Sequence, residues 1–307
     1  MLQIQELCKA YDSHTVLDNI NLRIQRGQLF GLVGPNGAGK TTILKVLAGL
    51  LEHDLGTIVL DGEETSTRER RGCTKISYMP DYFGVYPNLK VYEYMEFYTQ
   101  LYGYKGKEAR KRIEENLELV SLYSKKDEYV ETLSRGVKQK LSLARCLIAE
   151  PELLLLDEPS SGLDPRACRE IEEVLHTLQK KQITIIISSH ILHELSRICT
   201  NIGIIDHGKL IIDGRVEDIL KMEEKSKPLR IRFTEVNANV LKYLDSHALI
   251  SNLIIDGTQV MMQFQGDSLE EASLLSALIR DGAGICYFAR EESSLEQLFL
   301  EITKGES

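Results

Sequence analysis

Nearly continuous apolar runs predict the central strands of this chain. One run is Leu153–Leu156, a second is Ile183–Ile187 and a third is Leu29–Val33. Strands of a parallel sheet are buried on both faces, so their side chains do not alternate between apolar and polar. The runs therefore predict a parallel α/β sheet that is covered by helices from the segments between them.

Apolar residues at helical spacing, and short alternating segments, supply further elements. Five residues recur at i, i+3, i+4, i+7 and i+10, as on one helix face: Val91, Tyr94, Met95, Tyr98 and Leu101. Two more helices are predicted over Lys107–Leu119 and Val137–Ala149. The other predicted strands are Leu2–Cys8, one or two within Val16–Ile24, Gly56–Leu60, Lys75–Met79, and a hairpin of Ile202–Ile205 with Leu210–Ile212.

The pattern changes after the charged segment Lys221–Lys227 and Pro228, which marks a linker. The segment beyond Pro228 has the β-α-β-β-α-β order of a ferredoxin-like unit. Its predicted strands are Leu229–Thr234, Leu249–Ile255, Gln259–Phe264 and Ile285–Ala289, its helices contain Val236–Leu244 and Leu274–Ile279, and an amphipathic helix closes it at Ser294–Thr303. We therefore predict a first domain over residues 1–221, a linker over residues 222–228 and a small α+β domain over residues 229–307.

Composition narrows the class of protein. The 307 residues suffice for two domains, and 43% of them are hydrophobic, as in a globular protein. No apolar run approaches the roughly 18 residues that a membrane helix needs, and no export signal is visible, so we expect a protein of the cytosolic side. Asp and Glu number 46 against 37 Lys and Arg, a net charge of −9 that argues against nucleic-acid binding. The six cysteines form no C-x-x-C pair, so a zinc site is not expected.

The candidate chemistry begins with a glycine-rich segment between the run Leu29–Val33 and a helical pattern. Its nine residues are Gly34, Pro35, Asn36, Gly37, Ala38, Gly39, Lys40, Thr41 and Thr42, and they fit G-x-x-x-x-G-K-[ST] without a gap. The glycines let successive N–H groups point inward around a phosphate, and the following helix adds its positive dipole end. Lys40 is predicted to reach the β- and γ-phosphates, and the Thr41 hydroxyl to ligate Mg²⁺. The segment predicts a nucleotide-binding protein.

Two acidic residues follow the run Leu153–Leu156. Asp157 is predicted to hold Mg²⁺ through water, and Glu158 to polarise the attacking water. Open α/β sheets bind ligands at the carboxyl ends of their strands, which is where these side chains stand. A solvated acidic turn is the alternative, and the upstream phosphate motif favours the catalytic interpretation.

The stretch Leu133-Ser134-Arg135-Gly136-Val137 precedes the predicted helix Val137–Ala149. Here the sequence resembles the ATPase subunits of ABC transporters, whose signature motif is Leu-Ser-Gly-Gly-Gln; Arg135 and Val137 depart from it. The resemblance covers roughly residues 2–221 and implies that Ser134 and Gly136 bind the γ-phosphate held by another copy. An ordinary serine N-cap is the alternative for Ser134.

The same resemblance implies roles for other positions. Ser161-Gly162-Leu163-Asp164 looks like the loop that crosses the dimer interface, and His190 like the switch histidine at the γ-phosphate. Tyr11, expected in a loop, looks like the aromatic residue that stacks on adenine, although a packing tyrosine is nearly as good an interpretation. Asp81 stands where the family has a glutamine that touches Mg²⁺, so its carboxylate is a predicted metal ligand.

An aromatic cluster follows Asp81, formed by Tyr82, Phe83, Val85 and Tyr86. It is either a locally packed loop or a groove that receives a helix from a membrane partner.

The resemblance implies the fold of a P-loop ABC ATPase domain, a mixed sheet with a helical subdomain, and ATP and Mg²⁺ as cofactors. The stretch Ser294–Leu300 resembles the C-terminal domain of drug-resistance-type export ATPases of the daunorubicin group. We therefore expect an export ATPase that acts as a head-to-tail homodimer or heterodimer, on the cytoplasmic face of the membrane. It would touch the membrane only through separate permease subunits. The alternative is a soluble ABC-type ATPase that acts on a ribosome or a nucleic-acid complex.

Overall fold

The computed structural model describes residues 1–12, 14–71, 73–82, 84, 86, 88–219, 228–235 and 238–290. The chain divides into two units, Met1–Arg215 and Val216–Ser307. Most of the expected linker, residues 222–228, lies outside the described residues, so the three-segment division stays a prediction. Among the described residues, no helix has the length and the apolar character that crossing a bilayer requires.

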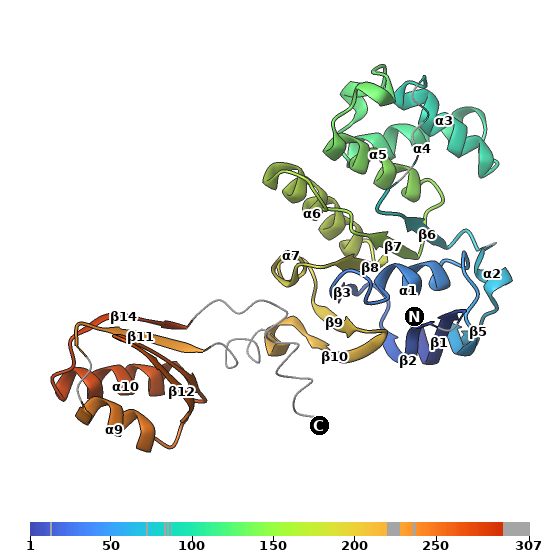
Figure 1. Ribbon diagram of the computed structural model, residues 1–307. Helices are drawn as coiled ribbons and strands as arrows, with labels where there is room; N and C mark the ends of the chain where they lie inside the picture. Colours follow the sequence, from blue (N-terminus) through green and yellow to red (C-terminus); the bar gives the residue numbers. More distant parts are fainter. Residues whose placement is uncertain are drawn as a thin grey trace. The chain divides into compact units, whose positions relative to one another are not determined.

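A six-stranded sheet forms the centre of the first unit, with strand order β10-β9-β3-β8-β7-β6 (Figure 1). All neighbouring pairs are parallel except β9 and β10, which form the predicted antiparallel hairpin. Every residue of β3, β7 and β8 is buried, which confirms the interpretation of the apolar runs. The strands are β3 (Leu29–Val33), β6 (Ile76–Met79), β7 (Leu153–Asp157), β8 (Thr184–Ser189), β9 (Asn201–Asp206) and β10 (Lys209–Arg215).

A second sheet of the same unit is antiparallel and has the order β2-β1-β4-β5. Helix α1 (Lys40–Leu47) buries its apolar residues in a core that both sheets share. The start of α1, which follows the phosphate motif, is therefore fixed by packing from two sides. The strands are β1 (Leu2–Tyr11), β2 (His14–Ile24), β4 (Leu55–Leu60) and β5 (Glu63–Glu64).

The helical subdomain lies beyond the edge strand β6 and contains α3, α4 and α5 (Figure 1). Two predicted helices are confirmed, and the third starts two residues earlier than predicted, because Ser134 caps it. Helix α6 begins at Pro165, after the N-cap Asp164, whose carboxylate accepts two backbone N–H bonds. The helices are α2 (Thr67–Arg71), α3 (Val91–Leu101), α4 (Gly106–Leu119), α5 (Arg135–Leu147), α6 (Pro165–Lys180) and α7 (Leu192–Ser196), with 3₁₀ turns at Tyr123–Lys125 and Val130–Thr132.

The second unit has the predicted β-α-β-β-α-β order. Its antiparallel sheet has the order β12-β13-β11-β14, and its core contains residues from the strands and both helices. The predicted closing helix Ser294–Thr303 lies outside the described residues. The elements are β11 (Leu229–Phe233), α9 (Ala238–Ser246), β12 (Ile250–Asp256), β13 (Gln259–Phe264), α10 (Ser268–Arg280) and β14 (Ile285–Arg290).

Candidate functional site

The glycine-rich segment Gly34–Thr42 connects the end of β3 to the start of α1, as its motif predicts. Gly39 has a φ angle of 110°, which L side chains rarely adopt. A Cβ on Gly34 would lie 2.2 Å from the carbonyl oxygen of Ile205, and one on Gly39 would lie 2.9 Å from that of Val16. Glycine is therefore required at both positions to close the loop against β2 and β9.

Lys40 is the first residue of α1 and is almost fully buried. Its Nζ donates hydrogen bonds to the carbonyl oxygens of Gly34 (2.7 Å) and Pro35 (3.0 Å). The same atom lies 3.7 Å from Oε1 of Glu158. Burial lowers the pKa of the Lys40 ammonium, while the Glu158 and Asp157 carboxylates oppose that shift. A buried ammonium whose partners are mainly neutral carbonyls can transfer its hydrogen bonds to an incoming phosphate.

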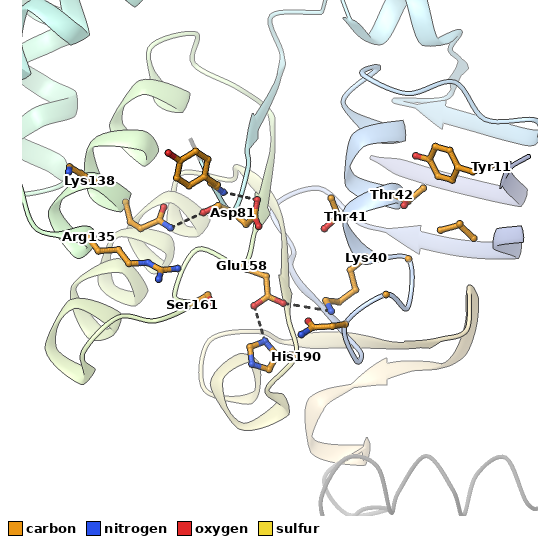
Figure 2. Close-up of a pocket in the computed structure, with 16 residues that line it drawn as sticks. Tyr11, Lys40, Thr41, Thr42, Asp81, Arg135, Lys138, Glu158, Ser161 and His190 are labelled. Carbon is orange, nitrogen blue, oxygen red and sulfur yellow. Dashed lines mark hydrogen bonds and ion pairs between the residues drawn. The ribbon is translucent and has the colours of Figure 1, made fainter. Parts of the chain in front are cut away.

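Asp157 and Glu158 stand at the carboxyl end of β7, but their environments differ. Asp157 is fully buried, whereas the Glu158 side chain retains 15% of its exposure. Glu158 Oε2 lies 2.9 Å from Nδ1 of His190, which follows the end of β8. Glu158 thus stands between Lys40 and His190, which the dashed lines of Figure 2 connect. The structure brings together three predicted catalytic residues from three separate segments.

Two residues that sequence reasoning missed hold Asp157 in place. Its Oδ1 accepts a hydrogen bond from the Ser188 hydroxyl at 2.7 Å, and its Oδ2 accepts one from the Tyr78 hydroxyl at 3.2 Å. Burial and the Asp157 carboxylate together raise the pKa of Tyr78, which therefore stays protonated and can donate. The sequence signal for Ser188 is that it directly follows the apolar run Ile183–Ile187, which places it at the end of a predicted buried strand.

An open cavity of about 890 Å³ contains the site. Its two walls are clear in Figure 2: Lys40, Thr41, Thr42 and Tyr11 on one side, and Asp81, Arg135 and Lys138 on the other. Ten predicted site residues line it: Tyr11, Asn36, Gly37, Gly39, Lys40, Thr41, Thr42, Asp81, Glu158 and His190. Six others do not: Gly34, Pro35, Ala38, Asp157, Ser134 and Gly136. The described lining also includes Val16, Tyr82, Arg135, Lys138, Gln139 and Ser161.

Tyr11 is the last residue of β1, so its prediction in a loop was wrong. Strand β1 pairs with β2 as far as Tyr11 and His14, and this pairing extends the strand beyond the expected end at Cys8. Tyr11 is 47% exposed, and Lys9 Nζ lies 5.8 Å from the centroid of its ring. An aromatic ring with this exposure at the cavity mouth offers a face on which a base can stack.

Asp81 is exposed and is the second residue after the end of β6. Its Oδ1 accepts the Tyr82 backbone N–H at 2.6 Å, and its backbone carbonyl accepts a bond from Gln139 Nε2 at 3.4 Å. The N–H bond uses only one of the lone pairs of the Asp81 carboxylate, so the others can still bind a ligand in the cavity.

Ser134 and Gly136 stand at the N-terminus of α5. The Ser134 hydroxyl accepts the Val137 backbone N–H at 3.5 Å, as an N-cap does. Gly136 packs against α6, since a Cβ there would lie 2.9 Å from Cβ of Ala167. Neither residue lines the cavity of its own chain, although the neighbouring Arg135 does.

The oxygen donors fit a hard cation that is shared with a nucleotide. No group of three or more His, Cys, Asp or Glu residues that could hold a metal occurs within the described part of the chain. Mg²⁺ is usually bound by one or two carboxylates together with substrate phosphates and water. The Thr41 hydroxyl and the carboxylates of Asp157 and Asp81 are donors of the required kind near the phosphate motif.

Comparisons with known proteins agree with this geometry. The model of the ABC transporter family matches residues 17–161. The linearmycin resistance ATP-binding protein LnrL of Bacillus subtilis is 31% identical over 305 residues, which cover 99% of this chain and 98% of that protein. A Nod factor export ATP-binding protein I of Cupriavidus metallidurans is 32% identical over 100% of this chain and 98% of its own. The lantibiotic transport ATP-binding protein SrtF of Streptococcus pyogenes is 38% identical over 73% of this chain and 95% of its own.

Solved structures share the fold. The cbiO1 protein of Clostridium perfringens, part of an ABC transporter complex, is 29% identical with a TM-score of 0.65, over 72% of this chain and 90% of its own. An ATP-binding cassette seen as a dimer with ADP and Pi is 25% identical with a TM-score of 0.63, over 70% of this chain and 99% of its own.

The fold and the phosphate-binding site define a P-loop ATPase. The chain belongs to the ATP-binding subunits of ABC transporters, and it binds and hydrolyses ATP.

Proposed function

We propose that this chain powers an ABC exporter and that ATP is hydrolysed in the cavity lined by Lys40 and Glu158. The export direction is supported by relatives whose names refer to Nod factor export and to linearmycin resistance, and which match over nearly their whole length. That length includes the second unit, so the similarity is not confined to the ATPase core.

The phosphates are proposed to lie over the N-terminus of α1. The N–H groups of the Gly34–Thr42 loop and the Lys40 ammonium would bind them, and Tyr11 would stack on the base. Mg²⁺ would be held by the Thr41 hydroxyl and the Asp81 carboxylate and, through water, by the Asp157 carboxylate, and it would neutralise charge on the phosphate oxygens.

Glu158 is the proposed base that orients and polarises the attacking water. Its contacts support this role: one carboxylate oxygen faces Lys40 and the other accepts a bond from His190, so the side chain points into the cavity. His190 would donate to the γ-phosphate from the end of β8, where 43% of its side chain is exposed.

A second copy would complete the site, and the observation that carries this proposal is the position of Ser134 and Gly136. Both stand at a helix N-terminus, which favours anions, yet neither lines the cavity of its own chain. In a head-to-tail dimer, Ser134 of the partner subunit would close on the nucleotide held by Gly34–Thr42. The solved cassette that forms a dimer with ADP and Pi supports a dimeric assembly.

Separate permease subunits would anchor the ATPase to the cytoplasmic face of the membrane. An exposed aromatic surface near the loop after β6 supports such a contact: Tyr86 and Phe97 lie 5.6 Å apart, centroid to centroid, and both are at least 41% exposed. Exposed apolar side chains that cluster on a surface often mark a site of interaction with another protein. Two members of the predicted aromatic cluster, Phe83 and Val85, lie outside the described residues.

Glu158→Gln tests the function most simply. Glutamine keeps the shape of the side chain but cannot act as a base, so ATP should bind without being turned over. We expect gel filtration with Mg²⁺ and ATP to yield a stable dimer, while the same variant carrying Lys40→Ala stays monomeric. A Glu158→Gln protein that hydrolyses ATP at the wild-type rate would contradict the assigned base.

A further inference from the structure

One buried hydroxyl connects the two acidic residues of the site. Ser188 Oγ donates to Oδ1 of Asp157 at 2.7 Å and accepts the backbone N–H of Glu158 at 3.0 Å. A hydroxyl has a single donor hydrogen, and here it is directed at the carboxylate. Ser188 is fully buried, so water does not compete for either bond. The Ser188 side chain thus fixes the Asp157 carboxylate relative to the main chain of Glu158.

The second oxygen of Asp157 is held from the opposite side. Strand β7 lies between β8 and β6 in the sheet, and Tyr78 of β6 donates its hydroxyl to Oδ2 at 3.2 Å. Register explains why the three side chains meet. Asp157 pairs with Ser188, and Tyr78 pairs with Leu155, two residues before Asp157 and therefore on the same face of the sheet. Each flanking strand supplies one hydroxyl to one carboxylate oxygen.

The main chain of Glu158 needs such support. Its φ angle is +48°, in the left-handed region, where a non-glycine residue is strained and persists only if its surroundings fix it. The bond from its N–H to Ser188 fixes this conformation at the residue whose side chain faces both Lys40 and His190.

We propose that Ser188 and Tyr78 are positioning residues, which together clamp the Asp157 carboxylate and, through Ser188, orient Glu158. The proposal rests on the roles proposed above for the two acidic residues. One lone pair of each Asp157 oxygen is used by the clamp, and the remaining lone pairs are left to accept bonds from the water shell of the cation. Neither Ser188 nor Tyr78 is among the described residues that line the cavity.

Ser188→Ala in the full chain removes both bonds at once. Loss of such supporting contacts typically costs 10–100-fold in metal affinity or activity, and we expect ATP turnover to fall within about that range. Metal affinity is measured as well, because a general loss of stability would not lower it selectively. Electron paramagnetic resonance titration of Mn²⁺, in the presence of a non-hydrolysable ATP analogue, should show weaker Mn²⁺ binding, while the affinity for the analogue with EDTA stays unchanged.

Two further variants make the test decisive. Tyr78→Phe removes only the second donor, so it should weaken Mn²⁺ binding and turnover less, by roughly threefold to tenfold. Ser77→Ala removes a neighbouring buried hydroxyl of β6 for which no hydrogen-bond partner is found among the described residues, and it should change neither quantity. It therefore controls for the loss of a buried hydroxyl as such.

The proposed clamp is contradicted if Ser188→Ala and Tyr78→Phe both keep Mn²⁺ affinity and turnover within about twofold of the wild-type values. Such a change is far smaller than the loss that removal of a supporting contact typically causes. The clamp is equally contradicted if Ser77→Ala reproduces their losses. Failure of the clamp is distinguishable from failure of the proposed function. An inactive Glu158→Gln protein beside normal Ser188→Ala and Tyr78→Phe proteins contradicts only the clamp, whereas an active Glu158→Gln protein contradicts the assignment of the base itself.

Discussion

The two units of the chain differ in what their cores contain. In the first unit the buried side chains include charged and hydroxyl groups, among them Lys40, Asp157 and Ser188. In the described part of the second unit every buried side chain is hydrophobic, and its core is built around residues such as Phe233 and Leu244. Burying a charge is costly unless it is paired and hydrogen-bonded, and buried charged groups are frequent at functional sites.

This difference suggests that the first unit carries out catalysis and that the second unit has another role. Three of the buried polar groups of the first unit, Lys40, Asp157 and Ser188, stand at or just after the carboxyl ends of β3, β7 and β8. The second unit contributes a core that stabilises its own fold and a partly buried ion pair between Arg290 and Glu271. We therefore expect a regulatory or dimer-stabilising role for the second unit, and substitutions in the two units should affect different measurements.

The largest effect should come from Lys40→Ala. It removes the buried cation that the phosphates would contact, and loss of one such donor typically lowers turnover by roughly 10²–10³-fold. Nucleotide affinity should fall as well, which an equilibrium titration with a fluorescent ATP analogue would measure. Normal hydrolysis by this variant would show that the chemistry does not take place at this loop.

Leu244→Ala tests the difference between the two units by a change in the second unit. Leu244 is fully buried in the core of the second unit, so its truncation should cost about 2–5 kcal/mol of that unit's stability. Turnover should be unchanged under native conditions. The matched change Leu155→Ala, at a fully buried residue of β7, should lower both stability and turnover. Urea unfolding together with ATPase rates distinguishes the two, and equal loss of turnover in both variants would contradict the separation.

Asp81→Gln should have a moderate effect. Glutamine restores the family's usual side chain and retains a carbonyl oxygen that can ligate Mg²⁺, so turnover should stay within about tenfold, or roughly 1.4 kcal/mol. Steady-state ATPase kinetics at saturating Mg²⁺ would measure it. A complete loss of activity would mean that the carboxylate charge has a role of its own.

Deleting residues 227–307 should have the smallest effect on nucleotide binding. The described site residues all belong to the first unit, so ATP affinity should remain close to that of the full chain. Dimerisation or coupling to transport should weaken instead. A folded, truncated protein that fails to bind ATP would assign the second unit to the catalytic machinery.

Sequence predicted the parts of the site that are local in the chain. The phosphate loop is a continuous motif, and Asp157 and Glu158 follow a buried strand directly, so the sequence alone identified both as candidates. Ser188 and Tyr78 were missed as partners of Asp157, because their contacts depend on which strands are neighbours and in what register. The left-handed conformation of Glu158 has no sequence signal either, since glutamate gives no indication of a positive φ angle.

The fold was likewise predictable where an element has a local pattern in the sequence, and not where its limits depend on contacts with other elements. Apolar runs and helical spacing identified most strands and the three helices of the subdomain. The β1 strand was predicted too short, because its end is fixed by pairing with β2 rather than by an apolar pattern of its own. Helix α6 was not delimited in advance, although Asp164 and Pro165 are a capping residue and a first-turn proline at its start.

The central claim is that each site is shared between two copies of the chain. It is tested most directly by mixing two inactive variants, Lys40→Ala and Ser134→Arg, whose defects lie on opposite sides of the proposed composite site. In a head-to-tail dimer, half of the dimers in an equal mixture are mixed, and each of these contains one intact site, so the ATPase rate should rise to about a quarter of the wild-type rate. A mixture whose rate stays at the mean of the two separate variants would contradict the shared site.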